Sequence, residues 1–224
     1  MHTGRYVGML AGMLVAKKDR KVASPGSRNP EGTRQKLLQS AFEEIHKSGF
    51  RGTDLESILD RAGVTKGALY HYFESKADLG HAVVDEVIAE IGREKWLMPL
   101  QNAENPIDVL VEILLGSSTK PEHIRGGCPV NNLVLEMSPL DEGFRMRLAK
   151  QFDDWREAIA GALSRGQQKG LVRKDLDPDE TAIFLMATYE GYISLAKNSQ
   201  DAETLQSGMR TMAKYLETLR AKGA

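Results

Sequence analysis

The sequence predicts an all-α protein in which an N-terminal three-helix unit of the helix-turn-helix type precedes a larger helical bundle. Apolar residues recur at spacings of three and four along most of the chain, which is the period of amphipathic helices. Residues 54–73 contain two short stretches of this kind, separated by a glycine and a valine. The expected organisation is a flexible tail at 1–29, a helix-turn-helix domain at 30–78 and a helical bundle at 79–224.

The first helix is expected to run from Pro30 to Ser48, with Gly49 and Phe50 providing a glycine C-cap and its apolar contact. One face of this segment is apolar, so it is expected to support the turn that follows. That face consists of Leu37, Leu38, Ala41, Phe42 and Ile45.

The two helices of the turn are marked by their ends. Thr53 and Glu56 have the spacing of a capping box, which predicts that the second helix begins at Thr53. Gly63 stands where a left-handed residue ends a helix. Thr65 is the expected N-cap of the third helix.

The third helix has an unusual outer face. If Leu69 faces inward, then Gly67, Ala68, Tyr70 and His71 face outward at about 100° per residue. Small residues allow close approach to a DNA major groove, and polar rings reach phosphates or base edges. This face therefore favours DNA binding; the alternative is a helical hairpin with two incidental tyrosines.

The run from Thr33 to Leu79 resembles the DNA-binding domain of the TetR/AcrR repressors. The resemblance rests on Ala-Gly-Val-Thr-Lys-Gly at 62–67, Leu-Tyr-His-Tyr-Phe at 69–73 and the Ser-Lys that follows. It implies a DNA-binding transcriptional regulator, a homodimeric repressor on a palindromic operator, with no enzymatic activity and no cofactor. The expected DNA contacts are Thr33, Arg34, Thr53, Thr65, Lys66, Gly67, Ala68, Tyr70, His71, Tyr72 and Lys76.

Three of these contacts, Lys76, Thr33 and Arg34, lie near the starts of helices. Lys76 lies in the first turn of a fourth helix expected to run from Ser75 to about Trp96. A lysine is unfavourable at the positive end of a helix dipole unless an anion is near, so its position favours a phosphate contact. The family's first helix also contacts phosphates, which implicates Thr33 and Arg34. For Arg34 and Lys76 an ordinary solvated charge is the alternative.

Charge and cysteine content narrow the class of protein. The formal net charge is −1, but residues 1–80 carry 13 Lys and Arg against 9 Asp and Glu, so the N-terminal part is the electropositive one. A single cysteine excludes an internal disulfide and the common zinc-finger spacings, which favours the cytoplasm and no metal site. No run approaches the roughly 18 consecutive apolar residues of a membrane span.

The first 29 residues combine a short apolar run with the basic sequence Lys-Lys-Asp-Arg-Lys. The apolar run is brief and interrupted by glycine, which disfavours a secretory signal, and Met13 is a candidate start. A disordered tail is the expected state, and a basic arm that touches DNA is the alternative.

The C-terminal bundle is predicted from periodicity alone. Its last two helices have more apolar surface than an isolated hairpin needs, and a four-helix interface between two copies is the arrangement that the family uses. The expected interface residues are Ala187, Gly191, Met209 and Met212. The expected segments are helices at Pro106–Leu115 and Pro129–Met137, a polar break from Gly116 to Gly127, a long helix within Leu140–Gly170, and helices beginning at Pro178 and at Asp201.

Aromatic and polar residues of the bundle are candidates for an effector site, meaning a site for a small apolar, phenolic or electrophilic molecule. Plain core packing is the alternative for the aromatics, and caps or inter-helix bonds are the alternative for the asparagines. The candidates are Trp96, Cys128, Asn131, Asn132, Met137, Phe152, Trp155, Phe184 and Tyr189.

Cys128 has a second possible role. It precedes Pro129 at an expected helix N-terminus, a position that lowers the pKa of a thiol. The Gly-Cys-Pro sequence resembles a subgroup of the family, some of whose members respond to oxidants, quinones or aldehydes. A small buried core cysteine is the alternative.

Three classes of function remain for comparison. A ligand-responsive repressor is the main expectation, and a ligand-free architectural DNA-binding protein of the same fold is the alternative. The five histidines are scattered, and no nucleophile elbow, metal-ligand pair or phosphate loop accompanies them, which disfavours an enzyme.

Overall fold

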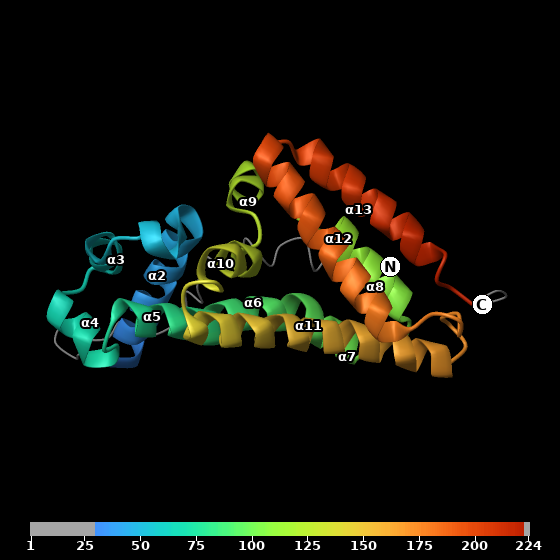
Figure 1. The fold of residues 1–224 in the computed structure, drawn as a ribbon, viewed down its shortest axis with the longest axis horizontal. Helices are drawn as coiled ribbons and strands as arrows, with labels where there is room; N and C mark the ends of the chain where they lie inside the picture. Colours follow the sequence, from blue (N-terminus) through green and yellow to red (C-terminus); the bar gives the residue numbers. More distant parts are fainter. Residues whose placement is uncertain (1–29, 222–224) are drawn as a thin grey trace, which may run out of the picture.

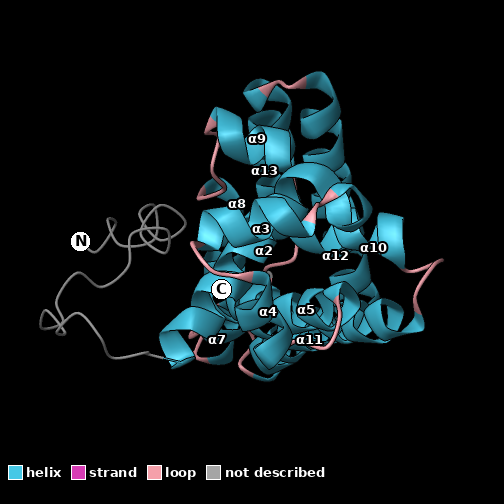
Figure 2. Cartoon of the chain, turned by 90° about the vertical axis from the view of Figure 1, so that its left-hand side faces the viewer, coloured by secondary structure: helices cyan, strands magenta, loops and turns pink. Residues whose placement is uncertain are grey.

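A computed structural model describes residues 30–221 of the chain, and the regular elements of that range are helices (Figures 1 and 2). Extended pairing within it is limited to one isolated antiparallel bridge between Val172 and Arg220. The all-α class is thus confirmed, while the expected tail at 1–29 lies outside the described residues. None of the described helices is long and apolar enough to cross a bilayer.

The helices fall into three groups. The N-terminal unit contains α2 (Pro30–Gly52), α3 (Leu55–Ala62) and α4 (Lys66–Tyr72). A continuous linker helix follows, with two π-helical segments: α5 (Lys76–Ala82), η1 (Val83–Ile88), α6 (Ala89–Gly92), η2 (Arg93–Leu97) and α7 (Met98–Gln101). The rest comprises α8 (Pro106–Leu115), α9 (Pro121–Gly126), α10 (Pro129–Met137), α11 (Glu142–Gln168), α12 (Pro178–Ser199) and α13 (Ala202–Glu217).

The packing forms two apolar cores joined by the linker helix. The N-terminal core combines α2, α3 and α4 with the first half of the linker helix, and Leu133 of α10 and Phe144 of α11 close it. The second core lies among η2, α7, α8, α11, α12 and α13. Figure 1 shows the linker helix and α11 running side by side below α10 and α12. The expected domain boundary at residue 78 falls inside α5, within one packed core.

The regular course of α2 breaks at Gly49, as the sequence predicts. Gly49 has φ 77° and ψ 163°, a backbone conformation that residues other than glycine rarely adopt. A Cβ there would also lie 2.8 Å from a carboxylate oxygen of Glu136. That carboxylate accepts hydrogen bonds from the backbone N–H groups of Phe50 and Arg51, each at 2.8 Å. Glu136 of α10 therefore fastens the end of α2 to the bundle.

The predicted capping box at Thr53 is wrong. Asp54 is the N-cap of α3, and its side chain makes no capping bond. The Thr53 side chain is buried, and its hydroxyl donates to the Gly49 carbonyl at 2.6 Å. The Thr53 backbone N–H donates to the same carbonyl at 3.1 Å, so Thr53 closes the end of α2 rather than capping the start of α3.

Two other boundaries differ from expectation, while α11 lies within its expected range. The linker helix continues past Trp96 to Gln101. The polar stretch expected as a break contains α9, which begins with a proline and buries Ile124. The long helix α11 begins at Glu142 because Asp141 caps it, accepting from the Phe144 N–H at 2.9 Å.

Replacing Glu136 by alanine should lower the free energy of unfolding by about 1–3 kcal/mol, because two backbone donors lose a charged acceptor. Glu112→Ala, at an exposed position of α8, is the matched control and should change stability little. Urea denaturation followed by circular dichroism measures both. Equal stability of the two variants would contradict a fastening role for Glu136.

Candidate functional site

The α4 helix is held in place by the turn that precedes it. Gly63 has φ 65°, and its N–H bonds to the Asp60 carbonyl at 3.2 Å. The Thr65 hydroxyl accepts from the Ala68 N–H at 3.3 Å, which confirms the predicted N-cap. Leu69 is fully buried and anchors the helix on the N-terminal core. The predicted helix-turn-helix geometry is thus present.

The outward face of α4 matches the sequence prediction. Thr65, Lys66, Gly67, Tyr70 and His71 are exposed, and Tyr70 leaves 46% of its surface accessible. Ala68 and Tyr72 of the same helix are partly buried. The centre of the Tyr72 ring lies 4.9 Å from that of the His71 ring. This face presents hydroxyl, amine and imidazole groups with little side-chain bulk between them. It lies at the end of the molecule away from α12 and α13 (Figure 1).

Arg34 is tied to the linker helix. Its guanidinium forms two parallel hydrogen bonds to the Glu86 carboxylate, at 2.5 and 2.6 Å, and lies 5.3 Å from the centre of the Phe73 ring. This pairing raises the pKa of Arg34 and lowers that of Glu86. Thr33 is partly buried beside it. The structure therefore gives Arg34 a bridging role between α2 and η1, which the sequence did not predict.

Lys76 also faces inward. Its amine donates to the Thr53 carbonyl at 2.5 Å and lies 4.8 Å from the centre of the Phe50 ring. Burial lowers the pKa of Lys76, although Asp54 and Glu136 oppose that shift. In this structure neither Lys76 nor the buried Thr53 side chain reaches the outer face of α4. The helix-dipole argument for Lys76 missed the tertiary acceptor at the end of α2.

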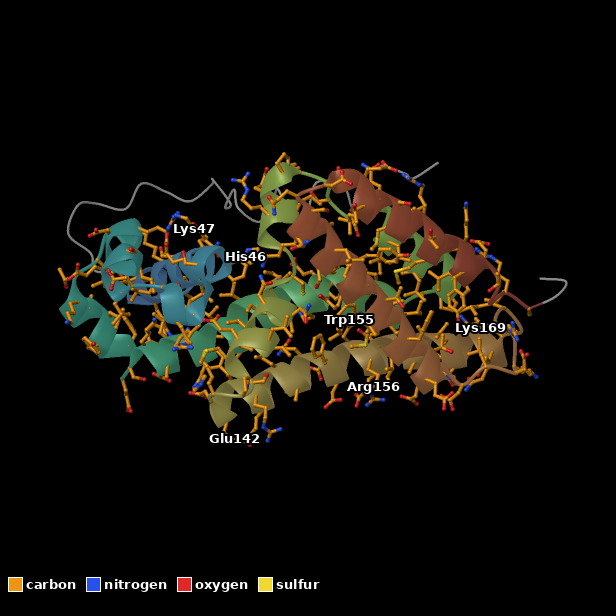
Figure 3. The ribbon with its side chains drawn as sticks, turned by 45° about the horizontal axis from the view of Figure 1, so that its top comes forward. His46, Lys47, Glu142, Trp155, Arg156 and Lys169 are labelled. Carbon is orange, nitrogen blue, oxygen red and sulfur yellow. The ribbon has the colours of Figure 1, made fainter. Side chains whose placement is uncertain are left out.

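The predicted effector residues Trp96, Trp155 and Tyr189 meet in the C-terminal core. The centres of the Trp96 and Trp155 rings are 4.6 Å apart, and Tyr189 packs edge-on to them at 5.2 and 5.7 Å. Phe152 stacks beside Trp155 at 6.3 Å. Figure 3 shows Trp155 between α11 and α12. The free space in this aromatic cluster is only about 10 Å³, so the cluster is closed.

Two predicted effector residues lie elsewhere. Met137 is buried in the N-terminal core. Phe184 is half exposed on α12, where its ring lies 5.1 Å from that of Tyr215. Both are apolar residues on correctly predicted helices, but the helix orientations point them away from the aromatic cluster.

Comparison with known proteins places this arrangement in a family. Residues 37–83 match the model for bacterial regulatory proteins of the tetR family, and residues 107–212 match the tetracyclin repressor-like C-terminal domain. An uncharacterized HTH-type transcriptional regulator from the lacX 3'region of Lactococcus lactis subsp. lactis is 34% identical over 196 residues, which cover 87% of this chain and 98% of the relative. The chain belongs to the TetR family. It is therefore a DNA-binding transcriptional regulator rather than an enzyme.

Other TetR-family proteins agree in sequence and in fold. The HTH-type transcriptional repressor DhaR of Mycobacterium sp. is 29% identical over 77% of this chain and 86% of its own length. A TetR regulator from Chloroflexus aurantiacus superposes with a TM-score of 0.76 at 28% identity, over 87% of this chain and 98% of the other. The reduced form of Escherichia coli NemR superposes with a TM-score of 0.71 at 25% identity, over 86% and 99%.

Cys128 of this TetR-family chain is not an activated thiol. It precedes α10, and the N–H groups of Val130 and Asn131 favour the thiolate as the sequence predicts. Burial nevertheless raises the pKa of Cys128 far above its ordinary value, and the nearby Glu190 raises it further. The prediction of a lowered pKa is therefore wrong, because desolvation outweighs the helix terminus.

Asn131 and Asn132 make inter-helix bonds, which was the alternative to ligand contact. The Asn131 amide donates to the Ser194 hydroxyl at 3.3 Å. Asn132 donates to the Gly126 carbonyl and accepts from Lys197, both at 2.8 Å. Asn132 also borders a surface groove of about 450 Å³ between α2, α10 and α12, which begins near His46 and Lys47 at the end of α2 (Figure 3).

The predicted interface residues divide into two groups. Ala187 and Gly191 are exposed on α12, and a Cβ at Gly191 would meet nothing within 4 Å. Met209 and Met212 are only 2% and 4% exposed and belong to the C-terminal core, so their assignment to an interface is wrong. The apolar stripe of α13 faces α8 and α12 within one chain.

Sequence reasoning missed two charged residues beside the aromatic cluster. Lys95 donates to the Tyr189 hydroxyl, and its amine lies 4.9 Å from the centre of the Tyr189 ring. Glu190 is 8% exposed, and neither of its carboxylate oxygens has a nitrogen or oxygen partner among the described residues. One signal was available: Glu190 follows Met186 by four residues in an apolar helix, a spacing that shares a face.

Lys76→Ala should lower the free energy of unfolding by about 1–2 kcal/mol, because the Thr53 carbonyl loses its donor. The dependence of operator affinity on salt should stay the same, since no phosphate contact is removed. Thermal unfolding and salt titrations of DNA binding measure the two effects. Unchanged stability with a salt slope reduced by about one would instead establish a phosphate contact.

Proposed function

We propose that this TetR-family regulator is a homodimeric repressor that binds a palindromic operator and leaves it when a small apolar or phenolic molecule enters the aromatic cluster. The outward face of α4 carries the proposal. Tyr70 and His71 stand exposed on a helix whose opposite side is anchored by fully buried Leu69. Such a helix is preorganised to enter a major groove with the side chains of one face.

The homodimer is supported by an exposed apolar surface on α12 and α13. Exposed apolar residues follow one another along α12 at helical spacing, and small residues among them permit close approach of a second copy. Two copies paired there place two α4 helices on successive major grooves if these helices are roughly 34 Å apart. This surface, the α12 face, comprises Ile183, Phe184, Ala187, Gly191, Leu195 and Tyr215.

The linker helix supplies a route from effector to DNA. Trp96 of η2 belongs to the aromatic cluster, while Leu79 of α5 belongs to the core that holds α4. Because the void is small, a molecule that enters must separate Trp96 from Trp155. An effector that favours this separated state lowers operator affinity by its preference for it, typically about 5- to 150-fold.

Two alternatives to a noncovalent effector are an electrophilic effector and a protein of the same fold that binds DNA without any ligand. An electrophilic effector needs a reactive Cys128 thiolate, and burial opposes its formation. The closed cluster favours the other variant, a ligand-free architectural DNA-binding protein, because a packed core leaves no ready space. A compound that binds the cluster and weakens operator binding distinguishes the repressor from that variant. The name of DhaR, a transcriptional repressor, supports the direction of regulation proposed here.

Tyr70→Ala should weaken binding to an operator selected by the native protein from random DNA by about tenfold or more, because a groove-facing contact is lost. Stability should hardly change, since the side chain is exposed. Tyr70→Phe separates the hydroxyl from the ring. Fluorescence anisotropy measures affinity, and native affinity in Tyr70→Ala would remove α4 as the reading helix.

Ala187→Glu should convert the dimer to a monomer, because two copies would bury four unpaired carboxylate oxygens near the symmetry axis. Operator affinity should fall sharply while circular dichroism remains native. Ala149→Glu, the same change at an exposed position of α11, is the matched control and should stay dimeric. Light scattering at micromolar concentration measures the mass, and a native protein that is already monomeric would refute the homodimer.

A further inference from the structure

Two buried polar groups of the aromatic cluster lack a full set of partners, and a partly buried lysine lies beside them. Neither Glu190 carboxylate oxygen has a nitrogen or oxygen partner within residues 30–221, although the Cys128 thiol interacts with the carboxyl, and the Trp155 indole N–H has no partner there. The Lys95 amine donates to Tyr189 and otherwise faces the rings of Trp96 and Tyr189, at 5.6 and 4.9 Å. Buried polar groups are normally paired, so this arrangement indicates a missing partner.

The protonation of these groups indicates which kind of ligand would pair with them. Burial raises the pKa of Glu190, although Cys128 and Lys95 oppose that shift, so the carboxyl tends to keep its proton. Burial alone would lower the pKa of Lys95, but its interactions, of which the hydrogen bond to the Tyr189 hydroxyl is one, raise it and favour the charged amine. The cluster then presents an ammonium, a carboxylic acid O–H and an indole N–H. All three are donors, which calls for an acceptor of negative charge.

We propose that Lys95, Glu190 and Trp155 form the recognition site for the carboxylate of a small organic acid whose apolar part separates Trp96 from Trp155. This inference rests on the proposed effector function and names the class of effector. Hydrogen bonds from an ammonium or a carboxylic acid to a carboxylate are charge-assisted and short, and they strengthen where water is excluded. A cationic amine is disfavoured because Lys95 repels it.

The proposed site lies where ligand binding would act directly on the linker helix. Lys95 and Trp96 are adjacent in η2, a π-helical segment of the linker helix, so charge recognition and ring separation act on the same turn. π-helical segments occur frequently at functional sites. Glu190 and Tyr189 are adjacent in α12, the helix that also carries the α12 face. An acid bound between them contacts both the linker helix and the proposed dimer helix.

The binding experiment uses the full-length protein and its own fluorescence, because the only two tryptophans of the chain, Trp96 and Trp155, are both in the cluster. Acetate, butyrate and cyclohexanecarboxylate are titrated, each beside its amide and the amine of matched shape. At least one carboxylate should bind about tenfold or more tightly than its amide, as a charge-assisted contact requires. If every amide or amine binds as well as its carboxylate, the inference is overturned.

Substitutions at Lys95 test whether this residue causes the preference for a carboxylate over its amide. Lys95→Met should abolish the preference for the carboxylate, and Lys95→Arg should retain much of it, while Lys214→Met at an exposed position of α13 is the matched control. Circular dichroism checks folding. If Lys95→Met does not fold, the site is tested instead by the carboxylate preference of Lys95→Arg relative to the native protein and by the pH profile of Glu190→Gln. A folded Lys95→Met protein with native preference overturns the site.

The pH dependence separates recognition from a purely structural role. Native affinity for the carboxylate should fall as the pH rises through the raised pKa of Glu190, because the ionised carboxyl loses its donor and repels the ligand. The ionisable groups that interact with Glu190 are Lys95 and Cys128. Glu190→Gln, whose amide donates at every pH, should bind without this fall. An identical fall in both proteins overturns the role of Glu190.

Operator release measured with the same compounds keeps the two proposals distinct. A carboxylate that binds through Lys95 but leaves operator affinity unchanged supports the site and contradicts its use in the proposed repressor function. A compound that releases the operator equally from native protein and Lys95→Met supports the repressor and overturns the carboxylate site.

Discussion

Burial of one face of the linker helix in both cores is the constraint on which the rest of the molecule depends. Leu79, Val83 and Ile88 are almost fully buried in the N-terminal core, while Trp96 and Leu100 are buried in the C-terminal one. A helix that crosses two cores cannot shift in one without disturbing the other, because packed interiors leave few voids. The α4 helix and the aromatic cluster are therefore connected through the apolar packing of the linker helix.

Two cations that flank α4 in the N-terminal unit are used within the protein. Arg34 bridges to Glu86, and Lys76 bonds to the Thr53 carbonyl. These contacts fix the angle between α2, α3 and the linker helix, so they position α4 rather than extend its surface. In the function proposed above, contact with DNA therefore falls mainly to the exposed side chains of α4 itself.

The C-terminal core is unusual in combining aromatic closure with buried charge. Trp96, Trp155 and Tyr189 fill the space that a ligand requires, yet Glu190 lies beside them without a nitrogen or oxygen partner within the described residues. A core evolved for stability alone gains by replacing such a carboxyl with an apolar residue, since burial of an unpaired polar group is costly. The closed aromatic stack and the unsatisfied carboxyl together fit a site that opens for a polar ligand.

The sequence by itself determined most of the helices, though not α9, and the orientation of α4. Gly49, Gly63 and Thr65 act within a few residues of their own position, so their caps were readable from local pattern. Contacts between distant segments decided what local pattern could not reveal. The acceptor for Phe50 lies 86 residues away, and the partner of Arg34 lies 52 residues away. Periodicity marks an apolar face without naming what it faces, so only tertiary packing placed Met209 in the core and gave Cys128 its raised pKa.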